Sequence, residues 1–173
     1  MKKLYFARHG LTVMNVEGKW SGTTETPLTD EGRAQAKAAG KAAKDLEIDY
    51  IACSPLGRAK ETAKIIAEEI GYPIKKIHIN PMLIERHFGE LEGQRRNPDI
   101  NLDGIADIET PETIIARAKF ALEWLHSIKA EHILVVSHGS FGGALRSLIL
   151  EEFPYDGPDR LANAELHHWI DKS

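Results

Sequence analysis

Short apolar runs alternate with longer stretches of helical periodicity along most of this chain. The runs that we expect to form strands are residues 3–7, 49–54, 77–79, 132–137 and 165–170. The stretches that we expect to form helices are residues 30–46, 55–69, 111–128 and 142–150. This alternation predicts an α/β fold, a three-layer αβα sandwich in which helices cover both faces of a mostly parallel central sheet.

Three of the expected helices begin with a recognisable signal. Thr29 precedes two acidic residues and is expected to cap the first helix. Ser54 and Thr110 are each followed by proline, which is favoured at the first position of a helix. The second helix would then begin at residue 55, with Arg58 in its first turn.

One long segment, residues 80–109, fits neither pattern. It contains several glycine and proline breaks, and eight of its residues between positions 85 and 103 are charged. Loops of this length inside a compact domain are usually functional. We therefore expect a single domain over residues 1–173 in which this segment is a short lid over the active site.

Composition excludes several classes of function. The 173 residues include 22 Lys and Arg against 26 Asp and Glu, a net charge of -4, so no broad surface for nucleic acid or anionic membrane is expected. Too few apolar residues precede the first arginine for a signal peptide or a membrane span, and we expect a cytoplasmic protein. The single Cys53 has no partner for an internal disulfide, which fits a reducing compartment. Composition leaves the oligomeric state open.

A histidine and an arginine, His9 and Arg8, stand together where the first expected strand ends. A neutral imidazole can attack phosphorus while a guanidinium holds the phosphoryl oxygens, although the pair would also suit a hydrogen-bonded histidine beside a solvated arginine. Arg58 and His138 favour the first interpretation, because each also follows an expected strand. The carboxyl ends of parallel strands meet at one edge of a sheet, so these side chains are predicted to converge there.

Five motifs in the same order resemble those of the histidine phosphatase superfamily, the phosphoglycerate mutase-like family. They are Arg8-His9-Gly10, Pro27-Leu28-Thr29, Ser54-Pro55-Leu56-Gly57-Arg58, Leu83-Ile84-Glu85 and Ser137-His138-Gly139. The resemblance extends over about residues 3–150. It implies a phosphomonoester hydrolase that acts on small phosphorylated metabolites through a phosphohistidine.

The resemblance also implies a role for each matching residue. His9 would be the nucleophile and Glu85 the proton donor, while the phosphoryl group would be bound by Arg8, Arg58 and His138. Further phosphate or substrate contacts would come from Asn15, Ser21, Gly22 and Gly139. Phosphoryl transfer needs an in-line nucleophile and dense positive charge, which these residues supply without a cofactor. The remaining histidines show no spacing typical of metal ligands, so no metal is expected.

The two histidines are expected to differ in charge. His9 has to be neutral at the attacking nitrogen, so its other ring nitrogen should donate a hydrogen bond to a backbone carbonyl. His138 should carry a proton once a phosphate dianion lies beside it.

Three alternatives to hydrolysis of small metabolites remain open: mutase-type phosphoryl transfer, hydrolysis of phosphohistidine in a protein, and phosphate binding without catalysis. The 52 residues between Glu85 and His138 are fewer than in the glycolytic mutases, which favours hydrolysis, and Ser140 stands where those mutases have asparagine. In contrast, the sequence from Glu85 to Gly89 resembles that of the mutases, except that Phe88 replaces a tyrosine. The pair Arg95 and Arg96 either contacts a second anionic group or is simply solvated.

Overall fold

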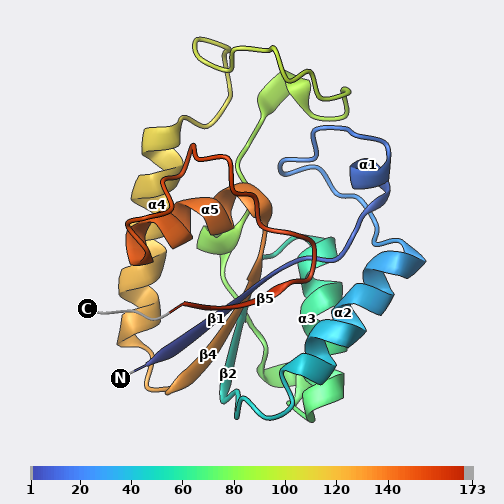
Figure 1. The fold of residues 1–173 in the computed structure, drawn as a ribbon, viewed down its shortest axis with the longest axis vertical. Coiled ribbons are helices and arrows are strands. Elements are labelled where there is room, and N and C mark those ends of the chain that lie inside the picture. The colour runs from blue at the N-terminus through green and yellow to red at the C-terminus, as the bar shows by residue number, and fades with distance from the viewer. Residues whose placement is uncertain (1, 170–173) are drawn as a thin grey trace.

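The computed structural model describes residues 2–169, which form a five-stranded sheet between two layers of helices (Figure 1). The strands lie in the order β3-β2-β4-β1-β5. Their bounds are β1 Lys3–Arg8, β2 Tyr50–Cys53, β3 His78–Ile79, β4 His132–Ser137 and β5 Leu166–Trp169. The first four strands are parallel and β5 runs antiparallel to β1, so the expectation of a mostly parallel sheet is confirmed.

The helices cover both faces of this sheet, which confirms the expected three layers (Figure 1). Their bounds are α1 Val13–Val16, α2 Asp30–Ala42, α3 Gly57–Ile70, α4 Pro111–Ser127 and α5 Gly139–Ile149. Helices α2 and α3 pack against one face, and α4 and α5 pack against the other. Short 3-10 turns occupy Ile74–Lys76, Pro81–Leu83 and Gly89–Leu91.

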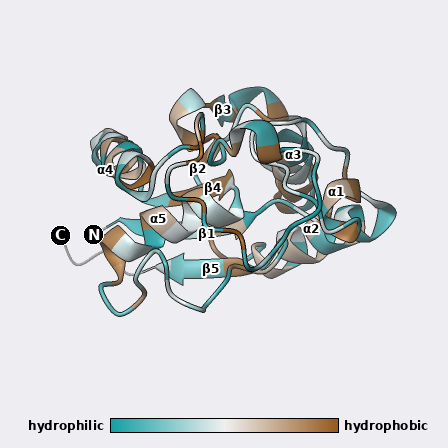
Figure 2. Cartoon of the chain, turned by 90° about the horizontal axis from the view of Figure 1, so that it is seen from above, coloured by the Kyte–Doolittle hydropathy of each residue, from teal (hydrophilic) through white to brown (hydrophobic). Residues whose placement is uncertain are grey.

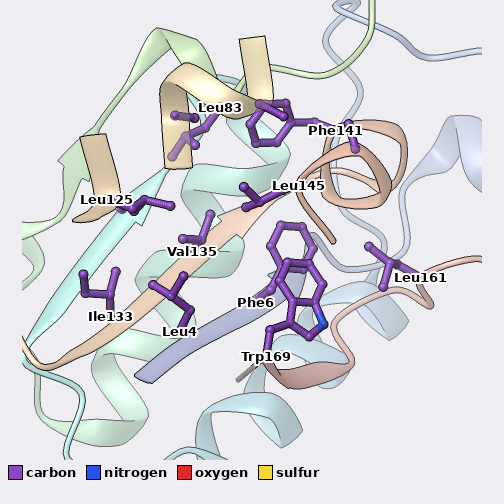
Figure 3. Close-up of a cluster of buried hydrophobic side chains, with 14 of the residues drawn as sticks. Leu4, Phe6, Leu83, Leu125, Ile133, Val135, Phe141, Leu145, Leu161 and Trp169 are labelled. Carbon is purple, nitrogen blue, oxygen red and sulfur yellow. The ribbon is translucent and has the colours of Figure 1, made fainter. Parts of the chain in front are cut away.

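Side chains that alternate along the strands fill two separate apolar clusters. Leu4 and Phe6 of β1 belong to the cluster under α4 and α5, and Tyr5 belongs to the cluster under α2 and α3. Phe6 stacks on Trp169 of β5, with ring centroids 4.7 Å apart (Figure 3). The edge strand β5 is hydrophilic (Figure 2), and such polar edges discourage pairing with other chains.

Two of the three expected helix caps are present, and one expectation is wrong. The hydroxyls of Thr29 and Thr110 accept hydrogen bonds from backbone amides in the first turns of α2 and α4. Helix α3, however, begins at Gly57, and no side chain of its capping residue bonds to its amides. The hydroxyl of Ser54 instead lies 2.7 Å from the imidazole of His138, a contact that local sequence cannot reveal.

Other boundaries of helices and strands also differ from the expected ones. Helix α5 begins at Gly139, three residues early, because the distant carboxylate of Glu85 accepts hydrogen bonds from its first amides. Helix α2 ends at Ala42 rather than at residue 46, and the short helix α1 lies between the expected elements of residues 3–7 and 30–46. The final strand was expected to reach Ile170, which lies outside the described residues.

The segment 80–109 contains no strand or α-helix and packs around a small cluster of its own. Phe88, Leu91 and Ile108 form the buried part of that cluster, and Trp20 packs against it. The segment stands at the top of Figure 1, above the carboxyl ends of the strands. Within residues 2–169, no helix combines the length and the apolar character needed to cross a membrane.

Candidate active site

His9 and His138 lie side by side at the carboxyl ends of two neighbouring strands. Strands β1 and β4 pair in register up to Arg8 and Ser137, so the residues that follow emerge together. The amide of His9 donates to the carbonyl of Ser137 at 2.9 Å, and the two imidazole centroids are 5.2 Å apart. The predicted convergence of these two residues is therefore present in the fold.

A cavity of about 370 Å³ opens beside the two histidines. The sequence-predicted residues that line it are Arg8, His9, Asn15, Ser21, Gly22, Arg58, Glu85 and Gly139. His138 has no exposed surface and lies against this group, because its ring faces that of His9. All nine predicted site residues are thus in one place.

The ring of His9 is oriented by its own backbone. Nδ1 lies 2.7 Å from the carbonyl oxygen of Gly10, so this nitrogen carries the proton of the neutral ring and Nε2 keeps its lone pair. Burial, followed by the charges of Arg8 and Arg58, holds the pKa of His9 well below its usual value. A neutral imidazole with a free Nε2 is the state that a nucleophile requires.

The ring of His138 is also neutral in the free site. Burial is the main cause that holds its pKa well below the usual value, and the charges of Arg58 and Arg8 act in the same direction. The expectation of a cationic His138 concerns the phosphate-bound site, where a dianion would oppose these effects.

Four buried polar atoms of the predicted site residues have no hydrogen-bond partner among the described residues. They are Arg8 Nε, Ser21 Oγ, Arg58 Nε and His138 Nδ1. Leaving such a group buried and unpaired costs about 1–3 kcal/mol, so folded proteins tolerate few of them. Four unpaired groups in one site indicate a site built for an anion with several acceptor oxygens.

Arg58 is held in place by the loop that precedes α2. Its two terminal nitrogens donate to the carbonyls of Gly22 and Thr24, at 2.6 and 2.8 Å, and only 2% of the residue is exposed. Burial lowers the pKa of Arg58. Gly22 therefore contributes a carbonyl that positions Arg58, whereas the sequence had suggested only a phosphate contact.

Glu85 is fixed at the amino-terminal end of α5. Its Oε1 accepts hydrogen bonds from the amides of Arg86 and Phe141, at 2.8 and 2.9 Å, and its Oε2 accepts one from the amide of Ser140 at 3.1 Å. Arg117 of α4 supports the preceding backbone by donating to two carbonyls of residues 82 and 84. The carboxyl group is thus held rigidly against the cavity wall.

The structure adds residues that the sequence motifs did not indicate. The side-chain amide of Asn163 donates to the carbonyl of His9 at 3.0 Å and to Oδ1 of Asn15 at 3.3 Å. Arg8 donates to the carbonyl of Leu161 at 2.9 Å. Leu161 and Asn163, which precede β5, thus hold the Arg8-His9 pair in place. No local signal in the sequence indicates these contacts.

Acidification is expected to destabilise the free protein from about pH 6.5 downward. In the unfolded chain His9 and His138 bind protons with a normal pKa, whereas in the folded chain their pKa is lowered. Their contribution to stability is therefore fully present above the unfolded pKa and is lost as the pH falls, by up to about 1.4 kcal/mol per pH unit for each histidine. Urea unfolding at about pH 7 and about pH 5.5 measures the loss. Equal free energies of unfolding at the two pH values would contradict it.

Metal ligands are a separate question. Within residues 2–169, no three His, Cys, Asp or Glu side chains lie close enough together to hold a metal ion.

The single thiol, Cys53, is buried, and burial raises its pKa to about 12. It is therefore not a candidate nucleophile.

A family model described as "Histidine phosphatase superfamily (branch 1)" matches residues 4–169. "Uncharacterized phosphatase PhoE" of Bacillus subtilis (strain 168) is 34% identical over 171 residues, covering 95% of this chain and 86% of the relative. "Probable phosphoglycerate mutase GpmB" of Escherichia coli (strain K12 / DH10B) is 34% identical over 162 residues, covering 87% and 75%.

Solved structures agree with these sequence matches. Bacillus stearothermophilus YhfR superposes with a TM-score of 0.86 at 27% identity, covering 97% of this chain and 90% of that one. The alpha-ribazole phosphatase from Shigella flexneri gives a TM-score of 0.79 at 26% identity, covering 96% and 89%.

Proposed function

The chain belongs to the histidine phosphatase superfamily, and we propose that it is a metal-independent phosphomonoester hydrolase that works through a phosphohistidine on His9. The observation that carries the proposal is the set of four unpaired buried polar atoms in a site that also holds a neutral imidazole. A bound phosphoryl group would give each of them an acceptor oxygen. We treat residues 1–173 as one catalytic domain in which segment 80–109 acts as the lid.

In the first step, Nε2 of His9 attacks phosphorus, and the bond from phosphorus to the leaving oxygen breaks. Glu85 gives that oxygen its proton, which we place on Oε2 because this oxygen accepts a single amide hydrogen bond while Oε1 accepts two. Arg8, Arg58 and the Nδ1 proton of His138 would hold the equatorial oxygens as their charge redistributes.

In the second step, water attacks the phosphohistidine from the side that the leaving group has vacated. The carboxylate of Glu85 takes a proton from this water as the new P–O bond forms. The P–N bond then breaks, which releases inorganic phosphate and restores neutral His9 and protonated Glu85. The same carboxyl group therefore serves as acid and then as base.

Replacing Glu85 by glutamine is expected to depend on the leaving group. For an alkyl phosphate, whose leaving oxygen needs a proton, kcat/KM should fall by at least about 10²-fold. For p-nitrophenyl phosphate, which leaves as a stable anion, kcat/KM should fall much less. Steady-state kinetics with the two substrates measure this, with Glu90→Gln as the control because Glu90 is an exposed acid in the same segment. Equal losses for both substrates would show that Glu85 is not the acid.

The leaving group would occupy the outer part of the cavity, which is rich in arginine. Six arginines line the cavity against three acidic residues, although the whole chain is acidic. The guanidinium of Arg96 stacks over the ring of Trp20, 5.3 Å from its centroid, and neither the Arg96 side chain nor the Arg160 side chain makes a hydrogen bond or ion pair with the described residues. These two charges favour leaving groups that carry a second negative charge.

Two phosphomonoesters that differ mainly at one group test this preference: 3-phosphoglycerate has a carboxylate where glycerol 3-phosphate has a hydroxymethyl group. We expect the wild type to favour the carboxylate in kcat/KM, and Arg96→Gln to reduce that ratio about tenfold, as for one lost charged contact. The control is Arg95→Gln, since Arg95 is exposed and does not line the cavity. If Arg96→Gln left the ratio of the two kcat/KM values unchanged, Arg96 would not contact the substrate carboxylate.

Mutase activity uses the same first step, but the phosphoryl group returns to an organic acceptor instead of water. Relatives of both kinds match this chain. The short stretch between Glu85 and His138 favours hydrolysis, and a concave cavity favours small metabolites over a phosphorylated protein surface. Release of inorganic phosphate, measured beside isomerisation of 3-phosphoglycerate, decides between the two reactions.

A further inference from the structure

The hydroxyl of Ser54 is completely buried and touches the imidazole of His138. Oγ lies 2.7 Å from Nε2, and neither residue has exposed surface. Strands β2 and β4 pair in register up to Cys53 and Val136, which brings the residues after both strands together. The pairing of β2 and β4 therefore places the Ser54 hydroxyl beside Nε2 of His138.

The other hydrogen bond of the Ser54 hydroxyl indicates which atom is the donor in this contact. The hydroxyl oxygen already accepts a long hydrogen bond, 3.3 Å, from the amide of Leu56. Its own proton has one acceptor among the described residues, which is Nε2 of His138. If Nε2 also carried a proton, the Ser54 proton would be left buried without an acceptor, at a cost of about 1–3 kcal/mol.

The hydroxyl is not needed to cap the neighbouring helix. The first amide of α3, that of Gly57, donates to the carboxylate of Glu25 at 3.0 and 3.1 Å. Ser54 lies three positions before that helix and makes no hydrogen bond to an amide within it. Its contact with the imidazole therefore stands out as the interaction that fixes this side chain.

We propose that Ser54 is a positioning residue that holds neutral His138 with its proton on Nδ1. That nitrogen is one of the four unpaired buried atoms of the site residues. His138 would then donate a hydrogen bond to the phosphoryl group from a neutral ring, which differs from the cationic ring expected from the sequence once phosphate is bound, and would add no third buried cation beside Arg8 and Arg58. The inference rests on the proposed function, because that function is what places a phosphoryl oxygen at Nδ1.

The tautomer is measured in the wild-type protein, and a variant is needed only to assign the signals of His138. Long-range proton-nitrogen NMR on protein labelled with ¹⁵N-histidine distinguishes protonated from unprotonated ring nitrogens, and loss of one signal set in His138→Gln assigns the ring. At about pH 7 we expect a protonated Nδ1 and an unprotonated Nε2. A proton on Nε2, or on both nitrogens, would overturn the inference.

Removing the hydroxyl tests what it does for the reaction. Ser54→Ala is expected to mix the two tautomers of His138 and to lower kcat/KM about tenfold, less than loss of the imidazole itself, and Ser54→Thr should restore both readouts. Ser137→Ala is the matched control for the tautomer, since it also removes a buried hydroxyl but one that bonds to the carbonyl of Leu83.

Two outcomes separate this inference from the proposed function. If Ser54→Ala keeps the Nδ1 tautomer and full kcat/KM, the positioning role is wrong even though the enzyme is a phosphatase. If the wild type shows the Nδ1 tautomer but His9→Ala hydrolyses substrate as fast as the wild type, the proposed function fails and the tautomer assignment survives.

Discussion

Replacing His9 with alanine is expected to lower kcat/KM for phosphomonoesters by at least about 10⁴-fold, because removing the nucleophile of a covalent mechanism removes the whole reaction path. The residual rate would come from binding and charge stabilisation alone. The substitution removes a ring whose Nδ1 bonds only to the adjacent Gly10 carbonyl, so the fold should persist. Release of inorganic phosphate measures the rate, and circular dichroism checks the fold.

The control for this variant is His78→Ala, in which an exposed histidine of β3 is removed. We expect wild-type activity in that protein. If a folded His9→Ala protein kept kcat/KM within about tenfold of the wild-type value, His9 would not be the nucleophile.

Replacing Arg58 with glutamine is expected to lower kcat by about 10³-fold or more, the range found for a single arginine that stabilises phosphoryl transfer. The unpaired Nε and the buried charge of Arg58 are both lost in this variant. Arg58→Lys should recover only part of the rate, because an ammonium group lacks the planar fork with which Arg58 bonds to two loop carbonyls while Nε stays unpaired. Steady-state kinetics on all three proteins give the comparison.

Arg58 also ties down the loop of residues 22–24, so its loss has a structural component. Lys60→Gln, in the same helix and exposed, controls for removal of a positive charge. Binding of vanadate separates the two effects, since a lost phosphate contact weakens vanadate binding while a displaced loop also lowers the melting temperature. Unchanged vanadate affinity in Arg58→Gln would contradict the assigned contact.

Much of the fold was predictable because its signals are local. The continuous apolar run of β4 indicated a strand buried on both faces, and Thr29 and Thr110 marked helix starts through contacts three residues away. The start of α5 was not predictable from local sequence. It depends on Glu85, 54 residues before Gly139, whose carboxylate satisfies the amides that a nearby side chain would normally cap.

The same distinction applies to the site. The residues at the ends of β1 and β4 could be grouped from the sequence, because parallel strands bring their carboxyl ends together. Ser54 was misassigned as a helix cap, since a serine before a proline carries that signal whatever lies opposite in space. Asn163 had no signal, because its partners, the His9 carbonyl and Asn15, lie at the other end of the chain.

The most direct test is to trap the covalent intermediate. Wild-type protein is mixed with a phosphomonoester labelled with ³²P, quenched in alkali within the first turnover, and the labelled peptide is identified by mass spectrometry. The account predicts label on the peptide that contains His9, as a phosphohistidine linked through Nε2 because Nδ1 carries the proton bonded to Gly10. Label on any other residue, or rapid turnover with no labelled protein, would contradict it.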